Sequence, residues 1–183
     1  SLTGSLRAGD AIPGSFRRKV WKIDAPGDLK KLELVDEVLP QPGPGEITVR
    51  VHSVGMNFAD VFTVLGMYDA APKGESVIPG LEFAGIVEAV GDRKSKPQAK
   101  VQRKEDGKSY VVVNRDEEEL KAAERGLRVG DRVMGFTRFG AYATHINTGA
   151  AFVRPIPDDW SFQQGAAFLV QALTAWYGTV ELG

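Results

Sequence analysis

Several side chains in this sequence carry groups that could act on a small molecule. Tyr68 carries a phenol, and a phenol with an unperturbed pKa of ~10 keeps its proton at neutral pH, so it can donate to a developing negative charge. Asn57 offers an amide donor and an acceptor in one side chain. His52 and His145 each stand alone in strand-like surroundings, and we assign neither of them a catalytic role.

The composition excludes several other kinds of chemistry. The sequence contains no cysteine, so it cannot form a disulfide, supply a thiolate nucleophile or bind zinc through sulfur. Its 23 basic and 24 acidic residues leave a formal charge of -1, which provides no overall positive field for nucleic acid or an anionic membrane. The apolar runs fall short of the ~20 residues that a membrane-spanning helix needs. We therefore expect a soluble protein, and we expect neither nucleic acid nor a membrane as its partner.

The elements that must position these side chains are mostly strands. Over residues 20–156, short β-type runs alternate with Gly and Pro, which is typical of a small barrel or sandwich. Residues 47–52 alternate between apolar and polar, which predicts one buried and one solvated face. Residues 83–90 are apolar at nearly every position, which predicts a strand covered on both faces. Another strand is expected at 132–136, after a Gly-Asp turn.

Two segments have helical periodicity instead. Apolar residues recur at helical spacing over 57–65, and Gly66 stands where such a helix would end. Ser161 is placed to cap a second short helix, and apolar residues occupy most positions from 167 to 182. We expect this last stretch to be mostly buried. Because nothing upstream requires it, we expect it to pack against a part that this sequence does not contain.

Two stretches are expected to lie outside the core. Residues 1–18 are rich in Ser, Gly and Arg without an apolar period, which predicts a flexible leader, with an organelle transit-peptide remnant as the alternative. Residues 92–125 are strongly charged and are typical of an insertion, with a β-hairpin over 100–113 and a helix over 115–125. We favour a solvated surface for the insertion over a docking arm for an acidic partner.

Four short motifs, in this order, resemble the medium-chain dehydrogenase/reductase superfamily. They are 54–60 (VGMNFAD), 79–85 (PGLEFAG), 129–133 (VGDRV) and 172–176 (ALTAW). Their order and spacing carry the resemblance, which covers residues 19–183 apart from the charged insertion. It implies a mainly β fold, with a GroES-like, partly open barrel over 19–160. It also implies connecting helices over 161–183 that lead toward a Rossmann domain outside this sequence.

The same resemblance bears on metal binding. Zinc alcohol dehydrogenases of the superfamily carry a Cys at the position of Asn57 and a His at that of Leu81, and they insert a four-cysteine lobe after the turn at 129–133. This sequence lacks both ligands and runs from the turn directly to residues 139–143. The resemblance is therefore to the zinc-free branch, with no metal site. Without a Lewis acid to polarise an alcohol, hydride addition to an already activated double bond is the expected reaction.

The zinc-free branch contains quinone oxidoreductases, enoyl-thioester reductases and the enoyl reductase domains of polyketide synthases. In the enoyl-thioester reductases, a Tyr at the position of Tyr68 is proposed to protonate the enolate that follows hydride transfer, whereas in quinone reductases it can be a rim aromatic. The resemblance makes Tyr68 and Asn57 the candidate catalytic residues. It assigns contacts with NADPH to Asn57, Phe58, Asp60, Phe62, Thr174 and Tyr177.

Each assignment has a structural alternative. Asn57 can cap the short helix, and Asp60 is better explained as a buried or helix-capping group than as an anion beside a reduced nicotinamide. Thr174 and Tyr177 can be packing residues of their helix. For Glu82, in the second motif, we expect a structural ion pair rather than a role as catalytic base.

The sequence has no glycine-rich loop that could hold a pyrophosphate at a helix N-terminus. NADPH would therefore be held mainly by the downstream domain, and we expect this chain to be inactive by itself. In a longer protein we expect a reductase of quinones or enones. The alternatives are an enoyl-thioester reductase and a non-catalytic GroES-like binding or scaffolding protein. A homodimer of the longer protein, the choice of NADPH over NADH, and a cytoplasmic or organellar location stay open.

Overall fold

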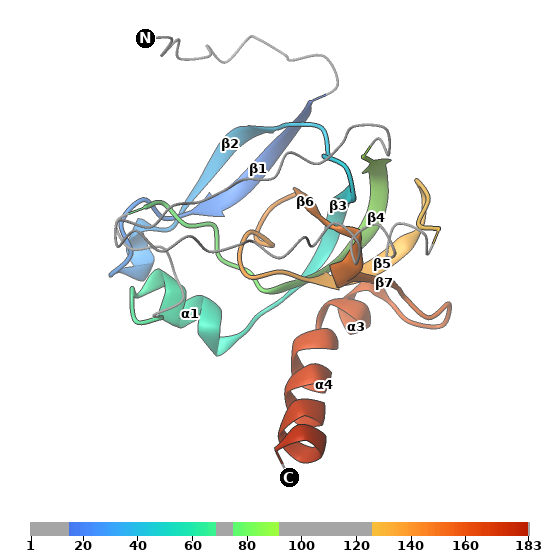
Figure 1. Cartoon of the computed structure of the whole chain (residues 1–183). Helices are drawn as coiled ribbons and strands as arrows, with labels where there is room; N and C mark the ends of the chain where they lie inside the picture. The colour runs from blue at the N-terminus through green and yellow to red at the C-terminus, as the bar shows by residue number, and fades with distance from the viewer. Residues whose placement is uncertain (1–14, 69–74, 92–125, 183) are drawn as a thin grey trace, which may run out of the picture.

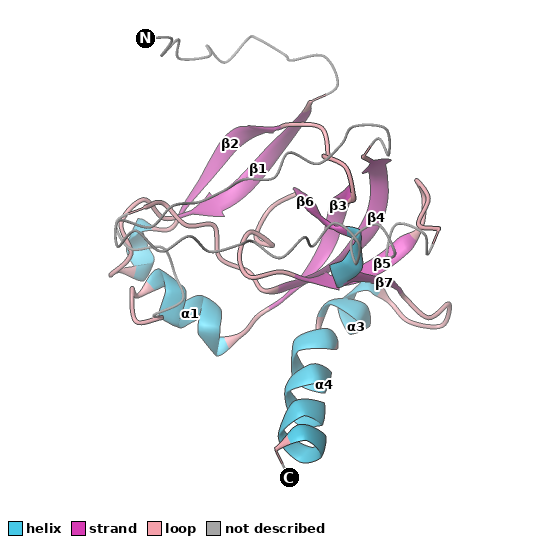
Figure 2. Cartoon of the chain, in the orientation of Figure 1, coloured by secondary structure: helices cyan, strands magenta, loops and turns pink. Residues whose placement is uncertain are grey.

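The computed structural model describes residues 15–68, 75–91 and 126–182. This part of the chain is mainly β, as expected, with two antiparallel sheets and a few short helices (Figures 1 and 2). The strands are β1 (Phe16–Lys22), β2 (Glu33–Leu39), β3 (Glu46–Gly55), β4 (Glu82–Val90), β5 (Arg132–Phe136), β6 (His145–Gly149) and β7 (Val153–Pro155). The helices are α1 (Phe58–Val64), α3 (Phe162–Ala166), α4 (Leu169–Trp176), the 3-10 turns η1 (Leu29–Lys31) and η2 (Ala150–Phe152), and the π-helical turn η3 (Tyr177–Glu181).

The larger sheet has five strands in the order β6-β3-β4-β5-β7, all paired antiparallel. The strands expected at 83–90 and 132–136 are confirmed as β4 and β5. The alternation expected over 47–52 is wrong at Thr48, which is fully buried. Its hydroxyl donates to Oδ1 of Asn147 across the β3–β6 pair at 2.6 Å, so a polar side chain is satisfied inside the sheet.

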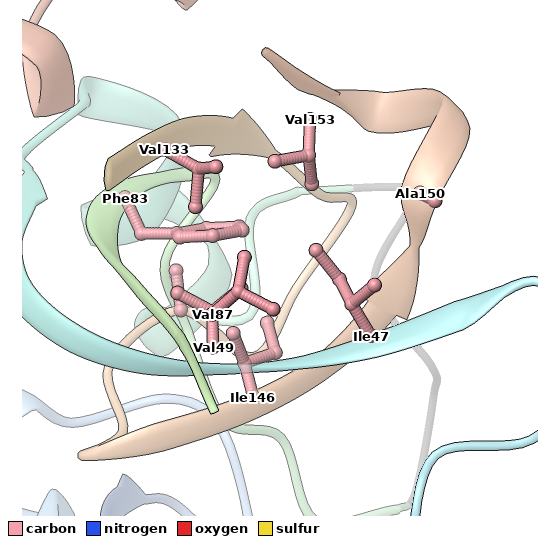
Figure 3. Packing of buried hydrophobic residues seen from close by; sticks show 9 residues of the cluster. Ile47, Val49, Phe83, Val87, Val133, Ile146, Ala150 and Val153 are labelled. Atoms are coloured by element: carbon pink, nitrogen blue, oxygen red, sulfur yellow. The ribbon is translucent and has the colours of Figure 1, made fainter. Parts of the chain in front are cut away.

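The core lies against this sheet, and its side chains meet around the ring of Phe83 (Figure 3). The labelled members are Ile47, Val49, Phe83, Val87, Val133, Ile146, Ala150 and Val153. Burying each of the larger ones contributes about 1.5–3 kcal/mol. Gly135 on β5 has a packing reason to be glycine, because a Cβ there would lie 2.5 Å from Cζ of Phe83. The ring can therefore reach the centre of the core only over a position without a side chain.

The strands β1 and β2 form a two-stranded ribbon beside the larger sheet (Figure 1). We refer to the larger sheet and this ribbon together as the barrel. Backbone hydrogen bonds join the ribbon to the loops before β6 and β4, from Trp21 N to Tyr142 O and in both directions between Ile23 and Val77. Because β1 begins at Phe16, the end of the expected leader over 1–18 is wrong. Pairing with β2 uses backbone groups, so the strand needs no apolar period. Residues 1–14 and the insertion at 92–125, with its expected hairpin and helix, lie outside the described residues.

The expected helix over 57–65 is confirmed as α1, and Gly66 follows it at φ +71°. Ser161 caps α3, and its hydroxyl accepts from the backbone N–H of Gln164. The burial expected for 167–182 against a part outside this sequence stays a prediction. Within the described chain, Leu169 is the buried residue of α4. Figure 1 shows why: α4 extends away from the sheets, so only its first turn meets them. Among the described residues, no helix is long and apolar enough to cross a membrane.

Candidate functional site

Glu82 is a buried carboxylate at the place where β4, α1 and α4 meet, with 1% of its surface exposed. Its Oε1 accepts from Nδ2 of Asn57 at 3.1 Å, and its Oε2 accepts from the backbone N–H of Val170 at 2.9 Å. Nε2 of Gln171 lies 3.5 Å from Oε1. The expected ion pair is wrong: the partners of Glu82 among the described residues are amides. The reason is its place beside the first turn of α4, whose unpaired backbone N–H groups attract a carboxylate.

Asp60, in the first turn of α1, is also buried, with 4% of its surface exposed. Its Oδ2 accepts from the backbone N–H of Asn57 at 2.9 Å and from the hydroxyl of Tyr142 at 3.1 Å. Its Oδ1 accepts from the backbone N–H of Gly80 at 2.9 Å. Both oxygens are therefore engaged inside the protein, which supports the structural interpretation of Asp60.

Burial is the largest influence on the pKa values of Asp60 and Tyr142. Desolvation raises the pKa of Asp60 above its usual 3.8, although the hydrogen bonds from Asn57, Gly80 and Tyr142 each lower it. Burial, followed by the neighbouring Asp60, raises the pKa of Tyr142. The phenol of Tyr142 therefore stays protonated and acts as a hydrogen-bond donor to the carboxylate.

Asn57 is held from two directions by these carboxylates. It has extended backbone dihedrals (φ -125°, ψ 152°) and is the N-cap of α1, with its backbone N–H on Asp60 and its side-chain amide on Glu82. Two residues earlier, Gly55 passes close to α3: a Cβ there would lie 2.5 Å from the carbonyl oxygen of Ala166. The chain thus leaves β3 past α3 and delivers Asn57 to Glu82 in one defined orientation.

Apolar side chains are exposed on both sides of Glu82. On the α1 side, Phe58 is 83% exposed and Phe62 is 44% exposed. On the α4 side, Thr174 is exposed, and the exposed large residues include Trp176 at 52% and Tyr177 at 54%. The hydrogen bonds of Glu82 connect Asn57 to the start of α4. Thr174 lies later in α4 and Tyr177 lies in η3, and Figure 1 shows α4 extending away from the sheets.

Tyr68 lies at the other end of α1. The turn at Gly66, with a hydrogen bond from Met67 N to Phe62 O, carries the chain past the helix to this residue. The half-buried Tyr68 ring meets Phe139 edge to face, with 6.3 Å between the ring centroids. Since a seven-residue helix is about 10 Å long, the two expected catalytic residues are separated by its full length. A joint role of Asn57 and Tyr68 stays a prediction.

Both histidines lie in strands and make structural contacts. His52 in β3 stacks on Phe162 at 4.4 Å between centroids, and its Nε2 lies 2.8 Å from a guanidinium nitrogen of Arg50. His145 in β6 places Nε2 3.0 Å from Oε2 of Glu88. In the described ranges, no three acidic or histidine side chains gather closely enough to hold a metal ion.

Sequence reasoning missed two members of this site, Tyr142 and Gln171. Tyr142 lies in the run 139–143, which carries no local signal that its hydroxyl reaches a helix far away in sequence. Gln171 lies in an apolar helical stretch, where a single amide is an available signal for a buried polar partner.

The sequence was compared with known families and proteins. It matches the alcohol dehydrogenase GroES-like domain family over residues 43–158. It is 35% identical to the human synaptic vesicle membrane protein VAT-1 homolog-like over 179 residues, which make up 98% of this chain and 34% of that protein. The crystal structure of that human protein matches with a TM-score of 0.69 and 32% identity, covering 91% of this chain and 44% of that one.

Two further relatives have metabolic names. A mycocerosic acid synthase-like polyketide synthase of Mycobacterium tuberculosis is 33% identical over 161 residues, which are 88% of this chain and 6% of that protein. The structure of Escherichia coli quinone oxidoreductase complexed with NADPH matches with a TM-score of 0.66 and 25% identity, covering 90% of this chain and 41% of that one.

These matches agree with the mainly β fold of the described residues. The chain spans 34% of the length of the human VAT-1 homolog-like protein, and a smaller share of the polyketide synthase. The family match covers most of the described barrel, from β3 to β7. The chain belongs to the alcohol dehydrogenase GroES-like domain family, in the zinc-free quinone oxidoreductase and enoyl reductase branch of the medium-chain dehydrogenase/reductase superfamily.

Proposed function

We propose that the whole protein is an NADPH-dependent reductase of quinones or enones that works without zinc, and that this chain forms the substrate-side wall of its active site. The observation that carries the proposal is the hydrogen-bonded connection Asn57–Glu82–Val170, which has exposed apolar side chains on both of its sides. A buried carboxylate that holds a partly buried amide beside exposed aromatic rings is an arrangement suited to a ring-shaped ligand.

The residues present fit the nicotinamide end of NADPH. Asn57 offers hydrogen bonds for a carboxamide or a ribose hydroxyl, and the exposed Phe58 and Phe62 offer apolar surface for a ring. The dinucleotide in the related Escherichia coli quinone oxidoreductase structure supports the choice of cofactor. Asp60 would act indirectly in this arrangement, by holding the backbone of Asn57.

When bound, NADPH would supply a hydride to the activated double bond. The role of this chain would be to orient the bound ligand and to exclude water from it. Asn57 would fix the ligand through its amide, and the aromatic rings of α1 would cover it. Tyr68 would stand at the rim, where it contacts Phe139 and offers its phenolic proton.

The proposal is tested by following NADPH consumption by the whole protein with 1,4-benzoquinone and with a simple enone. We expect saturable oxidation of NADPH, and we expect Asn57→Leu to reduce kcat/KM by at least about tenfold, the equivalent of one hydrogen bond to the transition state. Leu29→Ala, at an exposed position of η1 between β1 and β2, is the control and should leave the rate unchanged. A protein that consumes no NADPH with either class of substrate would instead be a non-catalytic member of the family.

Enoyl-thioester reduction is separated from this proposal by Tyr68→Phe. If Tyr68 protonates an enolate, the variant loses most turnover of a crotonyl-type thioester. On our proposal, the wild-type protein prefers quinones or enones, and the variant changes quinone turnover little because quinone reduction needs no proton from this position.

A further inference from the structure

The hydrogen bonds around Glu82 determine which way round the amide of Asn57 lies. Three groups point at its carboxylate: the backbone N–H of Val170, Nε2 of Gln171 and the side-chain amide of Asn57. The first is a donor by its chemistry, and a carboxylate is acceptor-only. The atom of Asn57 that faces Oε1 must therefore be the nitrogen Nδ2. Its oxygen Oδ1 is directed away from Glu82, toward the backbone N–H of Asp60 with which it forms the capping box of α1. A carbonyl oxygen has two lone pairs, so one is left for a ligand.

The orientation is tied to α4 as well. Val170 lies in the first turn of α4, and its backbone N–H cannot exchange roles with an acceptor. Oε2 of Glu82 is thus committed to the helix, and Oε1 is committed to Asn57. Burial of Glu82 at 1% exposure keeps water from replacing either partner. A single carboxylate therefore connects the placement of α4 to the orientation of one side chain on α1.

We propose that Glu82 is a positioning residue that makes Asn57 present its carbonyl oxygen, rather than its NH2 group, to the ligand. The ligand group facing Asn57 is consequently a hydrogen-bond donor, a hydroxyl or a carboxamide NH2. This inference rests on the proposed function, because it takes Asn57 to be a ligand contact. It adds the polarity of that contact and the residue that sets it.

The variant Glu82→Gln tests the idea without removing any volume. The Val170 N–H requires the oxygen of the new side-chain amide, so the NH2 of that amide faces Asn57, and Asn57 turns its own amide over to accept. The hydrogen bonds that join position 82 to Val170 and to Asn57 are then kept, and the cap of Asn57 on the Asp60 N–H is lost. Since a cap contributes about 1 kcal/mol, we expect the melting temperature to fall by only a few degrees. The group that Asn57 presents to the ligand changes from an acceptor to a donor.

The measurements are the Kd for NADPH and the melting temperature of the whole protein. We expect Glu82→Gln to weaken NADPH binding about tenfold, the effect of one hydrogen bond replaced by two opposed donors. The double variant Asn57→Asp with Glu82→Gln should restore most of the affinity, because a carboxylate at position 57 accepts from the new amide and also presents an oxygen outward. Asn57→Asp alone should lower the melting temperature, since it places two carboxylates together.

The outcomes separate this inference from the proposed function. If the wild-type protein does not bind NADPH, both fail. If the wild type binds NADPH and Glu82→Gln binds it equally well, the proposed function survives and the positioning role of Glu82 is refuted. The positioning role is also refuted if the double variant binds no better than Glu82→Gln. A merely structural Glu82 would lower the melting temperature in Glu82→Gln and would leave the Kd of the folded protein for NADPH unchanged.

Discussion

At the scale of single residues, this site uses carboxylates as acceptors rather than as bases. Asp60 takes three hydrogen bonds and Glu82 takes two or three, all from groups of the same chain. Both are buried, and each of their oxygens accepts from a donor. The two carboxylates therefore serve to hold Asn57, Gly80 and the start of α4 in place. On our proposal, Asn57 is the polar side chain through which this site meets a ligand.

Removing the hydroxyl of Tyr142 should destabilise the protein, because the buried Asp60 would lose a hydrogen-bond donor. Tyr142→Phe deletes one of the three donors to the buried carboxylate, so we expect the free energy of unfolding to fall by about 1–3 kcal/mol. The pKa of Asp60 should rise further, because the lost hydrogen bond lowers it in the wild type. Chemical denaturation measures the first effect. Tyr177→Phe, at an exposed position of η3, is the control and should change the stability by less than about 0.5 kcal/mol.

At the scale of elements, a charged cluster on one face of the ribbon joins β1 to β2. Glu37 accepts from Arg18 at 2.9 Å and from Lys22 at 3.1 Å, and all three side chains are partly buried. Partial burial alone raises the pKa of Glu37, but the hydrogen bonds and charges of Lys22 and Arg18 outweigh it and hold the pKa below its usual 4.5. The cluster is therefore a source of acid-sensitive stability.

The sign of that sensitivity follows from linkage. Because folding lowers the pKa of Glu37, its contribution is present above the unfolded value of 4.5 and is lost as the pH falls through the lower folded value. We expect Glu37→Gln to be less stable than the wild type at neutral pH and to lose less stability on acidification. Unfolding curves at several pH values measure this. Asp36→Asn breaks the exposed pair with Lys19 and should keep the acid dependence of the wild type.

At the scale of the whole molecule, the barrel has its own core while α4 and η3 expose most of their apolar residues. Leu169 is the buried residue of α4, and Leu173, Trp176 and Tyr177 are each about half exposed. An apolar surface of this kind marks a contact with another part of a protein. On our proposal, that part is the nucleotide-binding region of the whole protein, which would also complete the NADPH site.

The 183-residue chain by itself should therefore bind NADPH poorly. It has no glycine-rich loop at a helix N-terminus to hold the pyrophosphate, and the apolar face of α4 would have no partner. A titration followed by the fluorescence of the reduced nicotinamide should show no saturation at micromolar NADPH. Saturable micromolar binding would contradict the prediction. The whole protein, titrated in the same buffer, is the positive control.

The local elements of this protein could be predicted from the sequence alone. The strands at 83–90 and 132–136, the helix ending before Gly66 and the cap at Ser161 all depend on residues within a few positions of one another. The motif order and the missing zinc ligands were readable for the same reason, since they are facts of spacing and residue type.

The contacts that define the site were decided only by the tertiary structure. Glu82 is hydrogen-bonded to Val170, 88 residues away in the sequence, and Asp60 is hydrogen-bonded to Tyr142, 82 residues away. Neither pair has a local pattern, because a buried carboxylate accepts equally well from a cation, a phenol or a helix N-terminus. The exposure of α4 and the separation of Asn57 from Tyr68 likewise depend on how elements leave the barrel. Periodicity records which side of an element is apolar, but not what lies against it.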